Sequence, residues 1–413
     1  MTAAQTGTSV PFVPAARVRR IRESPSSAAA ARVRELVAAG ITVIDLTVGE
    51  PDFDTPRNVK DAAIAAIEAG ETKYTPVNGT PELRAAIRER MLRATGVEYQ
   101  DSQITVGGGG KQVIYLAFTA SLDPGDEVII PAPYWVSYPD MVLANDGTPV
   151  IVTTTAADRY KLTPQQLTDA ITDRTRWLVL NAPSNPTGVT YSRDELLALA
   201  AVLAAHPHVR VLTDEIYDEI TFGDAGSVGL AAAAPSIRDR VLTVNGVSKS
   251  YAMTGWRLGY AVGDPAVVRA INLLQSQTSS CPSSITQAAA TAALTGDQSF
   301  IDETVAVYRA RRDRALAGFA GIEGLVPIEP DGAFYLFVDC RGLLGRTTPA
   351  GATLETDLDV TLYLLDEAHV AVIQGSAYGL DGFFRLSYAT STETIDAGIQ
   401  AVRSAVARLR SAT

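Results

Sequence analysis

Between residues 103 and 275 the chain alternates short apolar runs with helical periods, and this alternation constrains its fold most strongly. Each apolar run is bounded by Gly, Pro, Asn or Asp, as strands in a compact domain are. Strand and helix in alternation favour a largely parallel sheet covered by helices on both faces. We expect strands at 103–106, 127–131, 149–153, 176–181, 210–213 and 241–245, and helices at 111–121, 193–205 and 265–275.

From about residue 305 the pattern changes to that of a small α+β domain. A long basic helical segment at 305–320 precedes an apolar segment at 332–338, a helix at 358–367 and strands at 370–373 and 383–387. The apolar segment 44–48 is expected to join this domain, which would then be built from both ends of the chain. The expected division is a mobile extension at 1–14, a small domain at 15–56 and 306–413, and a large domain at 57–305.

Composition excludes several classes of function. A net charge of -11 without a basic stripe argues against nucleic acid. Cys281 and Cys340 lack CxxC spacing, so neither a disulfide framework nor a zinc site is indicated, and a reducing cytoplasm fits. The three histidines do not stand with carboxylates or thiols at metal spacing. No stretch has the roughly 18 apolar residues that a membrane helix needs, and residues 1–14 do not read as a signal peptide.

A glycine run, residues 107–110, follows the strand expected at 103–106 and opens a helix at Lys111. In an open α/β sheet, ligands bind beyond the carboxyl ends of the strands. Glycines at the start of a helix let backbone N–H groups approach a phosphate, and the helix N-terminus adds partial positive charge. The run also suits a tight turn that binds nothing. It is not a Walker A loop, because Gln112 stands where Ser or Thr is required.

Lys249 follows the strand expected at 241–245. An amine held in partly buried surroundings has a lowered pKa and can condense with an aldehyde, although most lysines after strands are merely exposed. Arg257, beside a Trp and a Gly, offers a guanidinium for the phosphate of the same ligand. Asp214 ends another strand. Asp214 is either a helix N-cap or a carboxylate that keeps the nitrogen of a pyridine cofactor protonated. In the second case Tyr217 would hydrogen-bond the 3′-oxygen of the cofactor ring.

Several segments together resemble the class I aminotransferases of pyridoxal-5′-phosphate (PLP) fold type I, and the bacterial aspartate aminotransferases most of all. The resemblance runs from about Arg17 to the C-terminus. Each segment alone is weakly indicative, whereas the set is highly specific. The segments are VGEPDFDTP at 48–56, KYTP at 73–76, PYWVSYP at 133–139, NPTG at 185–188, AMTGWR at 252–257 and FRLSYA at 384–389.

The resemblance implies a large PLP-binding domain whose mostly parallel seven-stranded sheet lies between helices, plus a smaller α+β domain. It implies PLP as the cofactor, carried by Lys249 as a Schiff base. It also implies a homodimer with shared active sites, in which Tyr74 of one subunit reaches the phosphate bound by the other.

The same resemblance assigns the remaining contacts, each of which has an ordinary structural alternative. Trp135 would stack on the pyridine or fill a core, Asn185 would donate to the ring oxygen or form a turn, and Arg385 would clamp the substrate α-carboxylate or form a surface ion pair. The phosphate contacts implied are Gly109, Gly110, Lys111, Ser248 and Arg257, and the substrate contacts are Gly49, Trp135, Asn185, Arg385, Lys111, Ser26 and Ser276.

The distal carboxylate of the substrate would meet Lys111 and nearby hydroxyls, although Ala28 stands where a Thr is usual. The function implied is L-aspartate:2-oxoglutarate amino transfer by a ping-pong mechanism through a Lys249 aldimine. Prephenate, an aromatic or another amino acid is an alternative substrate. A lyase, decarboxylase or oxidase reaction on the same fold is an alternative chemistry, because the cofactor stabilises the carbanion and the protein selects its fate.

Overall fold

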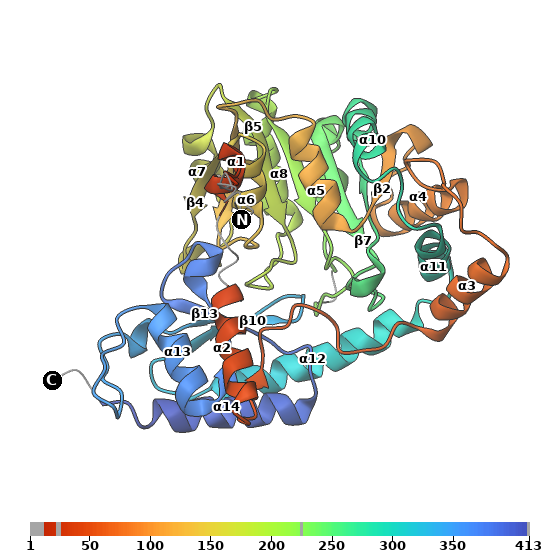
Figure 1. Cartoon of the computed structure of the whole chain (residues 1–413). Helices are drawn as coiled ribbons and strands as arrows, with labels where there is room; N and C mark the ends of the chain where they lie inside the picture. Colours follow the sequence, from red (N-terminus) through yellow and green to blue (C-terminus); the bar gives the residue numbers. More distant parts are fainter. Residues whose placement is uncertain (1–11, 22–25, 224–225, 411–413) are drawn as a thin grey trace, which may run out of the picture.

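A seven-stranded sheet forms the larger body of the computed structural model, which describes residues 12–21, 26–223 and 226–410 (Figure 1). Its strand order is β2-β8-β7-β6-β5-β3-β4, and β8 alone runs antiparallel to its neighbours among these strands. The predicted α/β fold with a mostly parallel sheet is therefore confirmed. The strands are β2 (Ile104–Gly107), β3 (Glu127–Ala132), β4 (Thr148–Thr153), β5 (Thr175–Asn181), β6 (Arg210–Asp214), β7 (Val241–Gly246) and β8 (Gly259–Val262).

Helices cover both faces of this sheet, since successive strand residues enter two different cores. Val128 and Ile130 pack in one hydrophobic cluster with α5 (Gly110–Thr119), α6 (Tyr138–Ala144) and α10 (Pro265–Thr278). Ile129, between them, packs in another with α7 (Pro164–Ala170), α8 (Arg193–Ala205) and α9 (Leu230–Ala233). At the β2 end lie α3 (Arg57–Glu68), α4 (Pro81–Thr95) and α11 (Ser284–Thr295) (Figure 1).

The strand β8 has no counterpart among the strands expected from the sequence. It is short, and its apolar run directly follows the AMTGWR segment. Gly259 begins it, and a side chain there would collide with the backbone of Gly109 and Gly110. A glycine at this position therefore lets β8 lie against the start of α5, which fixes the glycine turn at the sheet edge.

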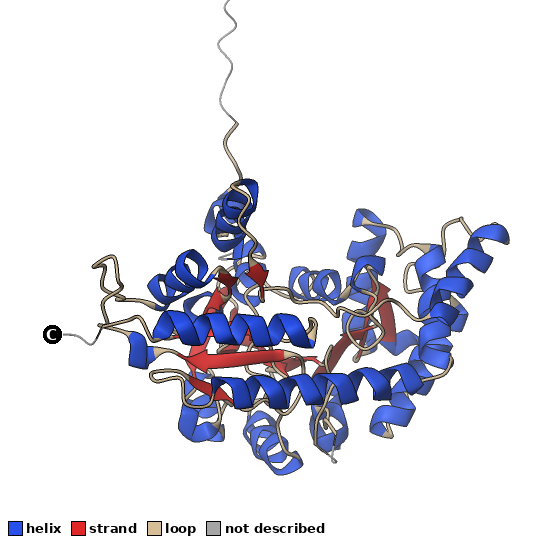
Figure 2. Cartoon of the chain, turned by 90° about the horizontal axis from the view of Figure 1, so that it is seen from below, coloured by secondary structure: helices blue, strands red, loops and turns tan. Residues whose placement is uncertain are grey.

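The smaller body contains a four-stranded antiparallel sheet in the order β12-β13-β10-β9. Long helices lie beside these strands when the molecule is seen from below (Figure 2). A separate parallel pair joins β1 (Ile44–Asp45) to β11 (Val370–Ala371). The other elements of this body are α2 (Ser26–Ala38), α12 (Ser299–Phe319), β9 (Val326–Ile328), β10 (Tyr335–Asp339), α13 (Asp357–Ala368), β12 (Ile373–Gln374), β13 (Phe383–Ser387) and α14 (Thr392–Val406). The short helix α1 (Ala16–Arg20) lies against α6 of the larger body.

Two expectations for this body are wrong in detail. The strand expected at 370–373 is broken, because β11 pairs with β1 while β12 pairs with β13 in the other sheet. The helix expected at 305–320 begins earlier, at Ser299, as part of α12. Within the described ranges, no helix combines the length and apolar character needed to cross a bilayer.

Candidate active site

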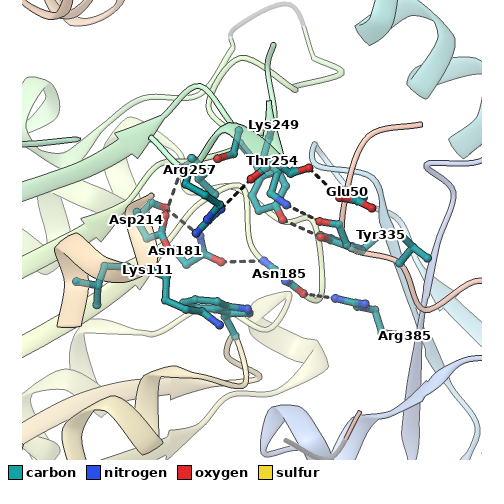
Figure 3. Close-up of a pocket in the computed structure, with 18 residues that line it drawn as sticks. Glu50, Lys111, Asn181, Asn185, Asp214, Lys249, Thr254, Arg257, Tyr335 and Arg385 are labelled. Atoms are coloured by element: carbon teal, nitrogen blue, oxygen red, sulfur yellow. Dashed lines mark hydrogen bonds between the residues drawn. The ribbon is translucent and has the colours of Figure 1, made fainter. Parts of the chain in front are cut away.

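A cavity of about 470 Å³ lies where the carboxyl ends of β5, β6 and β7 face β10 and β13 of the smaller sheet (Figure 3). It thus lies where ligands bind in open α/β sheets, and its other wall comes from the smaller body. Most of the site residues predicted from the sequence line it. They are Gly49, Gly110, Lys111, Trp135, Asn185, Asp214, Tyr217, Ser248, Lys249, Arg257 and Arg385.

Lys249 follows β7, and its Nζ donates a hydrogen bond to the carbonyl oxygen of Gly49. Burial lowers the pKa of this amine to about 8, and the positive charge of Arg385 acts in the same direction. Glu50 and Asp214 act in the opposite direction. The neutral form, which attacks an aldehyde, is therefore far more populated near physiological pH than in an ordinary lysine.

Asp214 ends β6 and is buried. Its Oδ2 accepts a 2.6 Å hydrogen bond from the hydroxyl of Tyr138, at the start of α6. Burial raises the pKa of the Asp214 carboxyl, while the bond from Tyr138 and the charge of Lys249 lower it. A buried carboxylate needs a positive partner, and a protonated pyridine nitrogen would supply one.

Asn185 connects the two walls of the cavity (Figure 3). Its backbone N–H donates to Oδ1 of Asn181 at 2.8 Å, and Nδ2 of Asn181 donates to the carbonyl oxygen of Asp214 at 2.9 Å. Its own Oδ1 accepts a 3.0 Å hydrogen bond from Nη1 of Arg385, which lies on β13. The ends of β5 and β6 are thereby tied to the guanidinium on the opposite wall.

The guanidinium of Arg385 is buried and forms no ion pair with any residue in the described part of the chain. Nη2 donates to the carbonyl oxygen of Thr47 at 2.6 Å, whereas the buried Nε has no hydrogen-bond partner there. A buried cation with an unsatisfied donor is costly unless an anion binds it. The group is therefore suited to a carboxylate ligand, and the alternative of a surface ion pair is wrong for this residue.

The glycine turn and Arg257 form the opposite end of the cavity. Gly109 has a φ of +97°, and a Cβ on it would come within 2.5 Å of Nη2 of Arg257. Nη1 of Arg257 donates to the carbonyl oxygen of Thr254 at 2.8 Å, and no acidic residue in the described ranges pairs with the guanidinium. With the N-terminus of α5 and Ser248 beside it, this corner can hold a dianionic phosphate.

Lys111 places its Nζ 4.7 Å from the centre of the Trp135 ring. Burial and the charge of Arg257 lower the pKa of this ammonium group. Trp135 in turn contacts Tyr138 edge to face, with ring centres 5.2 Å apart. The indole is thus held between Lys111 and the tyrosine that binds Asp214, and it lines the cavity as expected.

Four predicted site residues are not among those that line the cavity. Gly109 belongs to the glycine turn beside it, against Arg257. The side chain of Tyr74 is 89% exposed, so within one chain it reaches no part of the site. Ser276 lies on α10 and donates to the carbonyl oxygen of Leu273 at 2.7 Å. Ser26 begins α2, and its side chain lies outside the described residues.

Several residues that line the cavity, or that contact a residue lining it, were not predicted. Asn181 ends β5, so the rule that ligands meet strand ends would have found it. Tyr138 lies in the PYWVSYP segment but carries no signal for its bond to Asp214. Tyr335 begins β10, and its hydroxyl lies 2.7 Å from the hydroxyl of Tyr217. Glu50 accepts a 2.7 Å hydrogen bond from Thr254.

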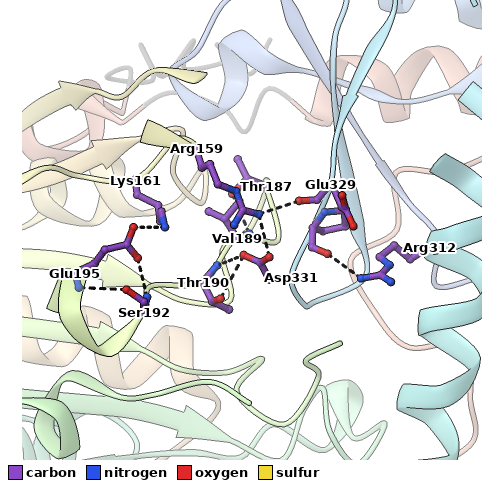
Figure 4. A network of polar contacts seen from close by, with 11 residues as sticks. Arg159, Lys161, Thr187, Val189, Thr190, Ser192, Glu195, Arg312, Glu329 and Asp331 are labelled. Atoms are coloured by element: carbon purple, nitrogen blue, oxygen red, sulfur yellow. Dashed lines mark hydrogen bonds and ion pairs between the residues drawn. The ribbon is translucent and has the colours of Figure 1, made fainter. Parts of the chain in front are cut away.

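The loop before β10 is hydrogen-bonded to the turn that carries Asn185, and we call this contact of Asp331 and Gly332 with Gly188 and Thr190 the clasp (Figure 4). The backbone N–H groups of Asp331 and Gly332 both donate to the carbonyl oxygen of Gly188 at 2.9 Å. The carboxylate of Asp331 accepts from the backbone N–H of Thr190 at 2.9 Å and pairs with Arg159 at 2.9 Å. Gly188 has a φ of +71°, and a Cβ there would collide with Pro330, so the clasp leaves room for glycine alone.

Residues 41–402 match the model of the family described as aminotransferase class I and II. The chain belongs to this family. It is 49% identical over 398 residues to an aspartate aminotransferase of Rhizobium meliloti (strain 1021), covering 96% of this chain and 97% of that one. It is 49% identical over 376 residues to an aspartate/prephenate aminotransferase of Cereibacter sphaeroides, covering 91% and 94%. The crystal structure of the Rhizobium meliloti aspartate aminotransferase matches with a TM-score of 0.95 at 48% identity, covering 97% of this chain and 100% of that one.

As a class I or II aminotransferase of this type, the chain is a PLP-dependent transferase. The residues of the cavity fit the cofactor on their own chemistry. The partly neutral Lys249 amine suits its aldehyde, and buried Asp214 suits its ring nitrogen. The corner formed by Gly109, Gly110 and Arg257 suits its phosphate.

Proposed function

We propose that this aminotransferase transfers the amino group of L-aspartate to 2-oxoglutarate. The observation that carries the proposal is the placement of two cations, Lys111 and Arg385, at opposite sides of the cavity with Asn185 between them (Figure 3). Neither cation pairs with an acidic residue in the described ranges. Two such groups suit a substrate with two carboxylates, as both aspartate and 2-oxoglutarate have. A Thermus thermophilus aspartate aminotransferase solved with maleate, also a dicarboxylate, supports this reading.

The residues of the cavity bind the substrate, exclude water and move protons. Arg385 binds the α-carboxylate through two parallel hydrogen bonds, and Gly49 leaves room for that carboxylate because it has no Cβ. Trp135 excludes water from the ring face. When bound, PLP accepts the electrons released as the substrate Cα–H bond breaks. Nζ of Lys249 removes the Cα proton as general base and later returns a proton as general acid, and Asp214 holds a proton on the ring nitrogen.

The proposal includes a cytoplasmic homodimer with shared active sites. Tyr74 is exposed in the single chain, as expected of a residue that serves the partner's phosphate site. Ser276 on α10 and Ser26 on α2 are proposed to add hydroxyls near the distal carboxylate. The division into a large domain at 57–305 and a small domain at 15–56 and 306–413 remains a prediction, with the pairing of β1 and β11 as its support.

The direct test mixes the purified, PLP-loaded protein with L-aspartate alone. We expect the visible band of the lysine-bound cofactor to convert to that of the aminated cofactor, with one oxaloacetate released per site, and 2-oxoglutarate to reverse the conversion. Release of carbon dioxide or ammonia instead would contradict amino transfer and favour a decarboxylase or lyase. Lys249→Ala is the control, because it cannot form the band.

Prephenate is the second candidate acceptor, and the Cereibacter sphaeroides relative named as an aspartate/prephenate aminotransferase favours it. Prephenate also has a second carboxylate, so Lys111 suits either acceptor. Lys111→Met keeps much of the side-chain length and removes the charge. We expect it to lower kcat/KM for aspartate by roughly 10- to 100-fold, the value of one hydrogen bond to a charged group, and to spare an aromatic amino acid. An equal loss for both donors would refute a carboxylate-binding role.

A further inference from the structure

We propose that Tyr335 is a positioning residue that aims the phenol of Tyr217 at the cofactor ring oxygen and holds the guanidinium of Arg385 toward the substrate. This inference rests on the proposed function, since it gives Tyr217 a cofactor contact. Tyr335 was not among the site residues predicted from the sequence, yet it touches three that were. Its hydroxyl lies within hydrogen-bond distance of the Tyr217 hydroxyl, and its ring faces the guanidinium of Arg385. The same hydroxyl lies beside Gly49, where a Cβ would come within 3.2 Å of it.

The hydroxyl contact has one arrangement compatible with cofactor binding. The two phenol oxygens lie 2.7 Å apart and both residues are buried, at 3% exposure for Tyr217 and 1% for Tyr335. Each phenol has a single proton to donate. If Tyr217 donates to the ring oxygen, the proton between the two phenols must come from Tyr335. Burial raises the pKa of both phenols, so both protons are present at neutral pH.

The ring contact serves the substrate side of the cavity. The guanidinium carbon of Arg385 lies 4.3 Å from the centre of the Tyr335 ring and 5.3 Å from that of Tyr378. Guanidinium groups are attracted to such ring faces. With Asn185 and Thr47 accepting from its two terminal nitrogens, the Tyr335 ring fixes the plane of the group. One side chain therefore orients both the cofactor contact and the carboxylate contact.

The hydroxyl has a consequence that can be measured. A hydrogen bond donated to Tyr217 polarises its own O–H group and makes it a stronger donor. A stronger bond to the ring oxygen stabilises negative charge there, so the neighbouring nitrogen joined to Lys249 holds its proton less tightly. The fixed charges facing this nitrogen are those of Arg385, Glu50, Asp214 and Arg257. Removing only the Tyr335 hydroxyl leaves all four in place.

The experiment is a pH titration of the visible absorption band of the PLP-loaded protein. We expect the midpoint for Tyr335→Phe to lie above that of the unmodified protein by about 0.5 to 1 pH unit, the size of one hydrogen bond. Tyr308→Phe is the matched control. Tyr308 and Tyr335 both pack against the ring of Phe334, with ring centres 5.3 and 4.8 Å from it. The hydroxyl of buried Tyr308 has no partner in the described chain, so the midpoint of Tyr308→Phe should not move. An unshifted midpoint for Tyr335→Phe would overturn the proposal.

A second comparison does not depend on the folding of that variant. The double variant Tyr217→Phe, Tyr335→Phe removes both hydroxyls and therefore leaves neither unpaired. Its visible band should titrate with the same midpoint as that of Tyr217→Phe alone. An additional shift would show that Tyr335 does not act through Tyr217. Tyr335→Leu should also raise KM for the amino acid several-fold, whereas Tyr335→Phe keeps the ring and leaves KM nearly unchanged. If the unmodified protein forms no visible band with PLP, the proposed function fails instead.

Discussion

The hydroxyl of Tyr138 donates a 2.6 Å hydrogen bond to Oδ2 of Asp214, and both groups are buried. This bond lowers the pKa of a carboxyl that burial raises. It therefore favours the ionised form that a protonated pyridine nitrogen requires. Tyr138 lies on α6 and Asp214 ends β6, so the contact joins a covering helix to the sheet edge below the cavity.

Tyr138→Phe should weaken the hold of Asp214 on the ring nitrogen. Because one hydrogen bond to a charged group is lost, we expect kcat to fall roughly 10-fold or more and the affinity for PLP to fall with it. Steady-state kinetics and PLP titration of the apoprotein measure both. Tyr260→Phe removes a buried hydroxyl that has no partner in the described chain, and it should leave both values unchanged. Unaltered kinetics in Tyr138→Phe would contradict the role.

The rate at which the apoprotein captures PLP should depend on pH through Lys249. The neutral amine attacks the aldehyde, and its pKa is lowered to about 8 from the ordinary 10.5. The rate should therefore rise as pH increases from about 7 to about 9 and then level off. Stopped-flow absorbance of the growing visible band measures it. A rate still climbing above pH 10 would mean that burial does not control this amine.

Glu215 should make the protein less stable as pH rises. Burial raises the pKa of this carboxyl to about 8 from 4.5, with Asp218 acting in the same direction. Between these values the folded chain keeps a proton that the unfolded chain releases, so the free energy of unfolding falls with increasing pH. Glu215→Gln removes this loss.

Thermal unfolding at pH 5 and pH 8 checks the effect of Glu215→Gln. The gain in Tm of the variant over the unmodified protein should be larger at pH 8 than at pH 5. Glu98→Gln alters an exposed carboxyl and should change Tm by the same amount at pH 5 and at pH 8. A gain that does not grow with pH would contradict the burial of a protonated Glu215.

Loosening the clasp around Gly188 should affect binding as well as stability (Figure 4). Asp331→Ala removes the acceptor for Thr190 and the partner of Arg159. We expect a loss of about 1.5 to 3 kcal/mol in the free energy of unfolding and a higher KM, because the turn positions Asn185. Arg159→Ala removes only the half-exposed partner, and it should cost no more than about 1 kcal/mol. Equal losses would mean that the ion pair, not the backbone contact, holds the clasp.

The sequence predicts the sheet and the residues at its strand ends well. The helix expected at 193–205 has those bounds in α8, because Ser192 and Glu195 form a capping box that fixes its start. The strand expected at 383–387 likewise corresponds to β13. The positions of Asp214 and Lys249 after apolar strands are a local signal that makes them candidates, and the resemblance to the class I aminotransferases assigns their roles.

Contacts between distant segments could not be predicted. Residues 370–373 form a continuous apolar run, so the sequence gives no sign of the break between β11 and β12. The break arises because β11 pairs with β1 whereas β12 pairs with β13. Nothing in the alternation of residues 332–338 places the Tyr335 hydroxyl on Tyr217, and nothing near Asp331 indicates Thr190. These contacts form only when the smaller sheet meets the larger one, so their signal is tertiary.

Arg385 lies on β13, the last strand in the described part of the chain, whereas Gly109, Asp214, Lys249 and Arg257 all precede it. Translation proceeds from the N-terminus, so these groups suited to the ring and phosphate are synthesised before the guanidinium suited to the substrate. Arg385 also lowers the pKa of Lys249. A chain that ends before β13 therefore lacks the selective arginine and also one of the charges that keep the lysine reactive, so substrate choice and cofactor capture both depend on the last strand to be made.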